Sequence, residues 1–496
     1  MERGMTRAVA GIGTRRIAAV ALLAGATAGG AVLGTVAARR APATALQPST
    51  LAAEAAPAAS TSSSWYCPGS PERAGATTQL LLANAARRAV WVHVEVVDAG
   101  GTQGQGTVRL EPHSETEVSP GHLVHGVWLA SRIEVAGGAV SATELVDGRT
   151  GRAVAPCASG VSTRWYFAAG STRGGSTLDV TVSNPTHDLA VVDLSFVTAS
   201  GSVAPAPFQG LVIEPGALRV LTVGAYVQNE GAVATVVVAR SGGVVAGELQ
   251  SYGSGGDEGV ALALGAPAAS PRWVLPNVED ASGGTSELTV FNPSNQQERA
   301  VVEVRLPAGP VQPFTQELGP QSVWTLATSE ELRIATQEPY TVEVRATGRG
   351  VVVARSASGA RLGPAPWWAN DIAATWLETS AAHQWMVASV PGLAQPVGSA
   401  LAAQVRTTAP STRSRIVVEN PARRTVRVEV TWWSGSSTTS HTPHVRELRL
   451  PAMARTTLAM PAGLAVVRAD RPIAVMGDAS PAGAVGVVGI PAVPLR

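Results

Sequence analysis

The chain has 496 residues, too many for one hydrophobic core, so we expect three or four folded units. Its 45% hydrophobic content, 4% aromatic content, 52 glycines and 34 prolines favour short strands and tight turns over long helices. The formal net charge is +1 and every basic residue is an arginine, so no basic field is available for a phosphate backbone and no nucleic acid partner is expected.

The amino-terminal region carries one long apolar stretch. Residues 17–38 contain no charged side chain and are long enough, at about 1.5 Å per residue, to cross a hydrocarbon core of about 30 Å. We predict a transmembrane helix there, with residues 1–16 as a cytoplasmic tail because they carry arginines. The expected localisation is the cell membrane, single-pass, with the carboxyl-terminal bulk extracytoplasmic. A cleaved signal peptide is the competing interpretation, since residues 43–45 offer a small-x-small site.

The next segment, residues 39–64, is a mixture of Pro, Ala, Ser and Thr with little bulky apolar surface. Such a composition is typical of a disordered stalk. A passive spacer is expected, with a glycosylated or partner-binding segment as the alternative.

A β-hairpin pattern then occurs four times. When the copies are aligned on an asparagine, apolar residues alternate before and after it, which is the period of a strand. The third copy reaches Val302, Val304 and Leu306 two residues later than the others, so its phase is kept. The asparagines are Asn84, Asn184, Asn292 and Asn420. An asparagine side chain can bond the backbone two residues on, so we interpret all four as structural turn residues.

Further markers recur at similar spacing. Each repeat opens with a tryptophan: Trp65, Trp165, Trp273 and Trp385. Each carries a later proline between strands: Pro112, Pro215, Pro320 and Pro451. Six or seven strands in about 100 residues, without helical periodicity, indicate an immunoglobulin-like sandwich rather than a propeller blade.

The predicted fold class is therefore all-β, with four tandem immunoglobulin-like β-sandwich repeats after an amino-terminal transmembrane helix and a disordered stalk. The repeats are expected at residues 65–157, 158–264, 265–363 and 385–496, with a Trp-rich linker at 364–384.

Cys67 and Cys157 are the two cysteines of the chain and flank the first repeat. An outward-facing chain sits where disulfides persist, so we expect a bond between them. Closing a loop of about 90 residues would stabilise the repeat by roughly 4 to 5 kcal/mol. Two free reactive thiols are the alternative.

No catalytic residue, cofactor or metal is expected. The pairs His122/His125 and His441/His444 have ligand-like spacing, but neither neighbourhood adds a cysteine or a carboxylate cluster, which favours solvated loop histidines. Four acidic residues share the outward phase of one strand, where a solvated sheet face requires polar side chains: Glu95, Asp193, Glu303 and Glu429. Without a recognisable catalytic motif, an enzyme is not expected.

Tryptophans are concentrated near residues 367–385. They would either pack the linker, with a short helix over residues 370–382, or form an exposed platform for sugar rings or a partner protein. Trp432 falls in the inward phase of its strand, whereas Trp433 points outward as an open contact residue. The candidate binding residues are thus Trp367, Trp368 and Trp433.

The features that carry a family resemblance are the membrane segment, the WYCPG motif at residues 65–69, the later Cys157 and the VSNP and VENP hairpins. With them, the chain resembles a family of actinobacterial, membrane-anchored extracytoplasmic proteins of unknown function. The first repeat departs from the pattern with Ala85 in place of proline. The resemblance implies the topology, the disulfide and an envelope location, and it brings no catalytic residues.

We therefore expect a membrane-anchored, extracytoplasmic, non-enzymatic scaffold or adaptor of the cell envelope, with a cell-envelope protein as partner. The alternative is a carbohydrate- or cell-wall-binding accessory protein whose partner is a cell-wall glycan. A hydrolase or transferase with an unrecognised site is the third hypothesis.

Overall fold

The computed structural model describes residues 52–494, apart from gaps at 74, 149–150, 255–256, 279–284, 335–337, 360–366, 372–374, 377–383, 388–412, 435–442, 461–462, 481–487 and 492. The chain divides into two units, Met1–Ser49 and Thr50–Arg496, and every described residue belongs to the second. The predicted cytoplasmic tail, the transmembrane helix and residues 39–51 of the stalk lie outside the described residues. Within the described part, no helix has the length and apolar character needed to span a membrane.

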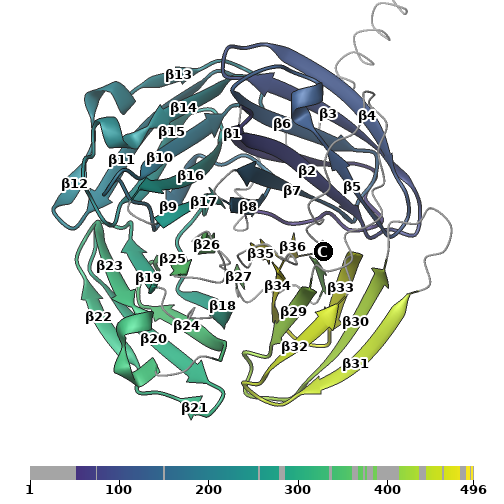
Figure 1. The fold of residues 1–496 in the computed structure, drawn as a ribbon, viewed down its shortest axis with the longest axis vertical. Helices are drawn as coiled ribbons and strands as arrows, with labels where there is room; N and C mark the ends of the chain where they lie inside the picture. Colours follow the sequence, from purple (N-terminus) through teal and green to yellow (C-terminus); the bar gives the residue numbers. More distant parts are fainter. Residues whose placement is uncertain are drawn as a thin grey trace, which may run out of the picture. The chain divides into compact units, whose positions relative to one another are not determined.

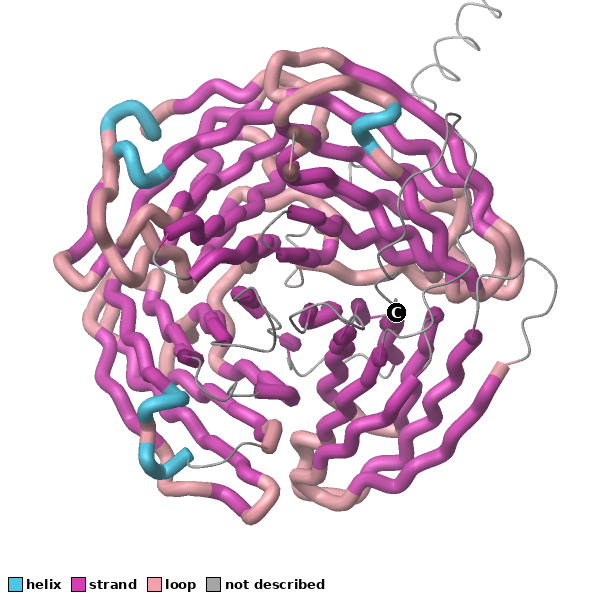
Figure 2. Tube along the Cα trace, viewed as in Figure 1, coloured by secondary structure: helices cyan, strands magenta, loops and turns pink. Residues whose placement is uncertain are grey.

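The described chain is all-β, which confirms the predicted class. Its strands pair in eight sheets, two for each of four consecutive segments that we call modules 1 to 4 (Figures 1 and 2). The modules span residues 63–156, 164–264, 272–376 and 384–494. In these residues helix is limited to short 3-10 turns: η1 (Pro120–His122), η2 (Ala206–Phe208), η3 (Val223–Ala225), η4 (Thr328–Glu330) and η5 (Leu332–Ile334).

Modules 1 and 2 have matching sheets. Module 1 contains β1 (Ser63–Pro71), β2 (Ala76–Asn84), β3 (Val90–Asp98), β4 (Gln103–Leu110), β5 (Ser114–Val118), β6 (Trp128–Val135), β7 (Val140–Gly148) and β8 (Gly151–Pro156), in the orders β1-β6-β3-β4 and β5-β2-β7-β8. Module 2 contains β9 (Arg164–Phe167), β10 (Thr177–Ser183), β11 (Ala190–Thr198), β12 (Gly201–Val203), β13 (Leu211–Ile213), β14 (Leu218–Thr222), β15 (Ala234–Ser241), β16 (Val245–Ser254) and β17 (Asp257–Leu264), in the orders β9-β15-β11-β12, with β13 on β11, and β14-β10-β16-β17.

Modules 3 and 4 follow the same order. Module 3 contains β18 (Arg272–Val278), β19 (Thr285–Asn292), β20 (Glu298–Leu306), β21 (Gly309–Pro310), β22 (Phe314–Leu318), β23 (Ser322–Ala327), β24 (Tyr340–Ala346), β25 (Val352–Gly359), β26 (Trp367–Asp371) and β27 (Thr375–Trp376), in the orders β27-β18-β24-β20-β21, with β22 on β20, and β23-β19-β25-β26. Module 4 contains β28 (Gln384–Val387), β29 (Arg413–Glu419), β30 (Val426–Ser434), β31 (His444–Leu450), β32 (Arg455–Met460), β33 (Gly463–Ala469), β34 (Ala474–Ser480), β35 (Val488–Pro491) and β36 (Val493–Pro494), in the orders β36-β28-β33-β30-β31 and β32-β29-β34-β35.

The alternation of the second hairpin strand places one face of each sheet in a core. Ala300, Val302 and Val304 are all fully buried on β20, whereas Leu306 is only partly buried. These three stand at the same distance from Asn292 as their counterparts stand from the other turn asparagines. The third copy therefore keeps the phase, as predicted, and only the two-residue offset that we predicted is wrong.

The opening tryptophans of modules 1 to 3 are core residues that also satisfy buried backbone, and the side chain of Trp385 lies outside the described residues. Trp65, Trp165 and Trp273 are at most 1% exposed. Their indole Nε1 atoms donate to the carbonyl oxygens of Val140 at 3.1 Å, Val244 at 2.8 Å and Val351 at 2.7 Å. Each indole thus joins the first strand of its module to a chain segment more than seventy residues away, combining a large buried apolar area with a satisfied N–H group.

The carboxyl-terminal part of the expected stalk is bound to module 1. The backbone N–H of Ala139 donates to Ala56 at 2.8 Å, that of Ser159 donates to Ala52 at 3.0 Å, and Ala55 is fully buried in the core of module 1. Small side chains let this segment approach closely, since a Cβ on Gly138 would stand 1.8 Å from the carbonyl oxygen of Pro57. The described part of the stalk is therefore ordered structure and not a free spacer.

Part of the expected Trp-rich linker is also sheet. The backbone of β26 pairs with β25, and β27 pairs with β18, so residues 367–371 and 375–376 belong to module 3. The helix considered for residues 370–382 is replaced by strand at the described positions, because these segments extend open sheet edges that local composition does not reveal.

Candidate binding site at the junction of modules 4 and 1

The four turn asparagines have equivalent surroundings. All are 0% exposed, and each Oδ1 accepts the backbone N–H two residues on, at 2.9 to 3.1 Å. Each Nδ2 donates to the carbonyl oxygen four residues on, at 2.7 to 2.9 Å, and to a carbonyl at the end of a later strand: Leu110, Ile213, Leu318 and Leu450. The side chains therefore satisfy backbone groups within a turn and tie that turn to a distant strand, and their polar atoms are fully used by structure.

The turn that contains the repeated proline is also alike in the four modules. One residue of each has a positive φ: His113 at 52°, Gly216 at 70°, Gln321 at 45° and Met453 at 58°. In modules 1 to 3 this residue directly follows the repeated proline, whereas in module 4 Met453 lies two residues after Pro451. A left-handed third residue is the requirement of a type II turn, which glycine meets without strain. In module 1 this position places an imidazole at the border of the module.

The modules contact one another in cyclic order within the Thr50–Arg496 unit (Figure 1). An apolar cluster joins Trp128 and Val146 of module 1 to Leu218 and Leu262 of module 2. Val197 of module 2 shares a cluster with the core of module 3. Arg305 of module 3 binds module 4, and Trp433, Leu464 and Val466 of module 4 join the core cluster of module 1. Module 4 therefore packs against both module 3 and module 1.

One sequence position lies at all four junctions. It stands thirteen residues after the turn asparagine, on the outward face of the second hairpin strand, and is occupied by Val97, Val197, Arg305 and Trp433. In three junctions this residue shares an apolar cluster or an ion pair with the residue that directly precedes the next module's turn asparagine. Val197 shares a cluster with Phe291, Arg305 forms an ion pair with Glu419, and Trp433 shares a cluster with Ala83. The residue types at these positions thus differ from junction to junction, apolar in one, charged in another and aromatic in the third.

Trp433 is consequently not the exposed contact residue that we predicted. Its side chain does point away from the core of module 4, but it is only 7% exposed because module 1 covers it. The indole stacks on the imidazole of His113, with ring centroids 4.1 Å apart and planes at 4°. Trp432 faces the core of module 4, as its phase predicted, and stacks on His444 at 5.3 Å. The side chains of Trp367 and Trp368 lie outside the described residues.

A cavity of about 830 Å³ lies beside the Trp433–His113 pair. This size is within the range of about 300 to 1,000 Å³ that is usual for small-molecule sites. Its lining residues come from both modules and from the ordered end of the stalk: Ala58, Ala85, Ala86, Arg87, Arg88, His113, Ala139, Glu429, Thr431, Trp433, Pro443, Val445 and Arg468. We call this the junction cavity.

The charges of the junction cavity come from three arginines and one carboxylate. Arg468 Nη1 lies 3.3 Å from Glu429 Oε1, and both side chains are about half exposed. Arg87 and Arg88 are exposed, and neither is paired with Glu429 in the described structure. The lining therefore carries two more cations than anions, with histidine neutral. Glu429 and Arg468 also line an adjoining hollow of about 510 Å³ with Arg427, Glu447, Arg449 and Asp470.

The outward acidic residues all have arginine partners across the sheet. Glu95 lies 3.7 Å from Arg132, Glu303 lies 3.9 Å from Arg345, and Asp193 binds Arg240. The Glu429–Arg468 pair is the fourth member of this set, so its presence alone does not make a site.

In the described chain, no group of three His, Cys, Asp or Glu residues could hold a metal ion, and His441 lies outside the described residues.

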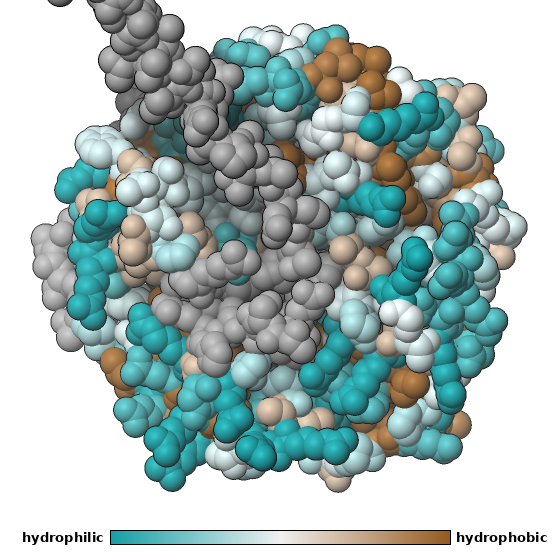
Figure 3. Space-filling view, turned by 180° about the vertical axis from the view of Figure 1, so that it is seen from behind, coloured by the Kyte–Doolittle hydropathy of each residue, from teal (hydrophilic) through white to brown (hydrophobic). Residues whose placement is uncertain are grey.

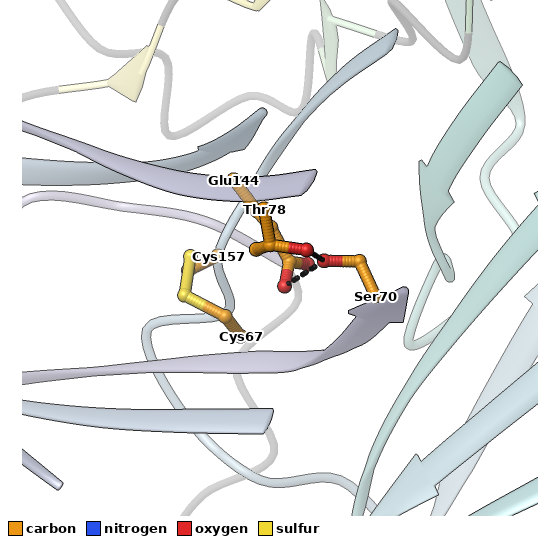
Figure 4. The surroundings of a disulfide bond; sticks show 5 residues. All are labelled: Cys67, Ser70, Thr78, Glu144 and Cys157. Carbon is orange, nitrogen blue, oxygen red and sulfur yellow. Dashed lines mark hydrogen bonds between the residues drawn. A yellow bond between two sulfur atoms is a disulfide. The ribbon is translucent and has the colours of Figure 1, made fainter. Parts of the chain in front are cut away.

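The predicted disulfide is confirmed between Cys67 and Cys157, whose side chains are buried (Figure 4). Beside it lies a buried acid that sequence reasoning missed. Glu144 accepts a hydrogen bond from the Ser70 hydroxyl at 2.7 Å, and burial raises its pKa from 4.5 to about 7. Glu248 stands at the same register in module 2, and burial also raises its pKa well above the usual range. The Glu-Leu pair that these two strands share was the available signal in the sequence.

We interpret both glutamates as core groups, because neither is more than 2% exposed and a substrate could not reach them. Among the described residues, exposed apolar side chains give no alternative site. Trp91, Val127, Val212 and Leu332 are exposed but lie in different modules or on different strands. In the face shown in Figure 3, the hydrophobic groups are small and separated by hydrophilic residues. The junction cavity is therefore the candidate functional site.

The fold and this site define an all-β protein of several packed sheets with a cavity where its last module meets its first. The chain belongs to a family of unknown function (DUF5719), whose model matches residues 131–395. That match is 265 of 496 residues and begins after the WYCPG motif. No curated protein matches the chain.

Two solved structures show weak likeness. A Thermotoga maritima protein (1070) shares 15% identity at a TM-score of 0.18, over 21% of this chain and 92% of its own. A tetra-tandem repeat from the extending region of a large adhesion protein shares 10% identity at a TM-score of 0.10, over 82% of this chain and 92% of its own. TM-scores this low identify neither a common fold nor a function.

Proposed function

We propose that this protein is a membrane-anchored, extracytoplasmic and non-enzymatic scaffold or adaptor of the cell envelope. The observation that carries the proposal is the cyclic packing of the modules, in which several junctions are held by complementary pairs. Such packing gives a rigid platform in which each module presents its own outer surface at a fixed position. The buried disulfide supports an oxidising compartment outside the cytoplasm.

The proposal includes the finer points of architecture and origin. We propose that the four modules are immunoglobulin-like repeats, on the basis of their common strand order and equivalent asparagine turns. The WYCPG motif and the apolar segment at residues 17–38 support a single-pass anchor and a relationship to actinobacterial envelope proteins. Sandwich folds host many functions, so this architecture does not by itself choose a partner.

The test is crosslinking of the full-length tagged protein in its native membrane, followed by mass spectrometry of the recovered partners and of its own amino terminus. An adaptor should recover a defined envelope protein together with an intact residue 1–38 segment. An Arg305→Val variant, which disrupts one junction, should lose that partner, whereas Arg299→Val on the same strand should retain it. Recovery of no specific protein, or a mature chain beginning near Leu46, would contradict an anchored adaptor.

A carbohydrate-binding accessory protein is the second candidate, and the junction cavity is the observation that favours it. The cavity combines an aromatic wall with hydroxyl, carboxylate and guanidinium groups, which can bond sugar hydroxyls. Stacking on an open face of Trp433 is not the mechanism, since the indole is buried against His113. Binding of purified protein to cell-wall glycan in a pull-down, and loss of that binding in Trp433→Ala, would support this function.

A further inference from the structure

We propose that the junction cavity binds an acidic saccharide, with the carboxylate of the ligand held by the arginines and its ring in the space that the small apolar residues and Trp433 border. This inference rests on the second function proposed above and names the ligand class of that site. It is independent of the scaffold function.

The first argument is that substitutions specific to modules 1 and 4 converge on this cavity. Where the other modules have proline after the turn asparagine, module 1 has Ala85, and the residue before that asparagine is the small Ala83. The left-handed turn position carries His113, whereas its equivalents are Gly216, Gln321 and Met453. Small residues on one side and a stacked indole–imidazole pair on the other leave a hollow at this junction.

The second argument is the balance of charge. The cavity lining contains three arginines, Arg87, Arg88 and Arg468, and one carboxylate, Glu429, which is paired with Arg468. The positive charge in the lining therefore exceeds the negative charge, which favours an anionic ligand. A guanidinium holds a carboxylate through two parallel N–H donors, which makes arginine well suited to this role. A neutral ligand would not compensate this excess positive charge, whereas a carboxylate would.

The third argument is the remaining lining, which suits a sugar ring better than an extended hydrocarbon. Ala58, Ala86 and Ala139 supply short apolar walls, and the largely buried Trp433 borders the cavity beside them. The Thr431 hydroxyl and the Glu429 carboxylate can bond ring hydroxyls. The adjoining hollow, which begins at Glu429 and Arg468, gives a longer saccharide room to continue over the outer face of module 4.

The test uses two pairs of probes that differ within each pair by a carboxylate-bearing group: D-glucuronic acid against D-glucose, and N-acetylmuramic acid against N-acetylglucosamine. Their dissociation constants for the full-length protein in detergent are measured by ligand-observed NMR titration. We expect the acidic member of at least one pair to bind ten-fold or more tightly than its neutral partner. Inorganic phosphate and acetate should compete weakly, because they lack the ring.

Variants then locate the site. Arg468→Gln and Arg88→Gln should each reduce affinity for the acidic probe at least five-fold while changing affinity for the neutral probe little. Arg240→Gln is the matched control, because Arg240 forms the corresponding outward ion pair with Asp193 in module 2. Thermal unfolding of each variant verifies that it folds, and Arg87→Gln, at an exposed position, replaces any variant that does not.

The outcomes separate the inference from the function on which it rests. Equal binding of acidic and neutral saccharides, or an effect of Arg240→Gln equal to that of Arg468→Gln, overturns the acidic-ligand site while leaving glycan binding in place. Competition by phosphate or acetate as strong as by the acidic sugars overturns the saccharide class. If no saccharide probe and no cell-wall glycan binds, both the inference and the carbohydrate function fail.

Discussion

Replacing Arg305 with valine should destabilise the junction of modules 3 and 4 more than any exposed arginine substitution. The Arg305 guanidinium bonds Glu419 Oε1 at 2.6 Å and also bonds Glu343, and these three side chains are 12%, 1% and 0% exposed. Glu343 retains Arg272 and Arg345, each at 2.7 Å. The lost charge compensation therefore falls mainly on Glu419.

The expected magnitude depends on pH because Glu419 titrates near neutrality. Burial raises its pKa from 4.5 to about 7, against the opposing effects of Arg305 and the Thr341 hydroxyl. Between these two values the unfolded chain releases the proton while the folded chain keeps it, so this group's contribution to stability falls as pH rises. Removing one partner of a buried ion pair costs about 3 to 5 kcal/mol. We expect that loss at pH 8.5 and a clearly smaller one at pH 5.5, where Glu419 is protonated.

A second substitution should rescue the variant. Val197 and Phe291 occupy the equivalent positions at the junction of modules 2 and 3 and pack in one apolar cluster. Adding Glu419→Phe to Arg305→Val copies that pair and removes the uncompensated carboxylate. Replacement of a buried ion pair by packed apolar residues is often neutral or stabilising, so the double variant should lie within about 1 kcal/mol of the original protein.

The assay is urea unfolding followed by circular dichroism at both pH values, with Arg299→Val as the matched control. Arg299 lies on the same strand and pairs with Glu317 at 3.6 Å, but both side chains are more than half exposed. An exposed pair of this kind contributes about 0 to 1 kcal/mol. The reasoning is refuted if Arg305→Val costs less than about 1 kcal/mol at pH 8.5, or if the double variant is no more stable than the single one.

Three further predictions concern the module cores. Glu144→Gln should stabilise the protein above pH 7 by up to about 3 kcal/mol, because burial raises the pKa of Glu144 from 4.5 to about 7 and each pKa unit corresponds to about 1.4 kcal/mol. The gain should disappear near pH 4.5, where the carboxyl group is also protonated in the unfolded chain. An unchanged pH profile of the melting temperature would contradict this. Replacing Cys67 and Cys157 by alanine should cost about 4 kcal/mol in urea unfolding, because the bond closes a span of 90 residues, and a smaller loss than about 1 kcal/mol would show that the reduced chain is already restrained. Asn184→Ala should cost about 2 to 4 kcal/mol, since two carbonyls and the Thr186 N–H and hydroxyl lose a partner, and Asn184→Asp should keep only the two bonds that Thr186 donates.

The sequence pattern was sufficient to predict structural features that depend on neighbouring residues or on the redox compartment. Strand alternation identified the buried faces around Val92 and Val192, and these residues are fully buried. The single cysteine pair allowed one intramolecular disulfide, which is present. The equivalent asparagines lie in turns because their side chains bond the backbone two residues on, a local interaction that composition can reveal.

The prediction was incomplete where a surface is covered by distant chain. Alternation correctly placed Trp433 on the outward face of β30, but it could not show that His113, more than three hundred residues earlier, covers that face. Likewise, a Pro- and Ala-rich composition gave no sign that Ala55 fills the core of module 1. Arg305 and Glu419 resemble surface charges in the sequence, yet the packing of two modules buries them.

The sequence by itself determined the all-β class, the phase of the principal strands, the turn positions and the cysteine pairing, because these follow from spacing, turn chemistry and a limited set of partners. Tertiary structure alone decided the junction pairs, the burial of Glu144 and Trp433, and the junction cavity. The physical reason is that the alternation of a strand shows which residues lie on each of its two faces. What covers the outer face, whether solvent or another module, depends on contacts between chain segments far apart in sequence.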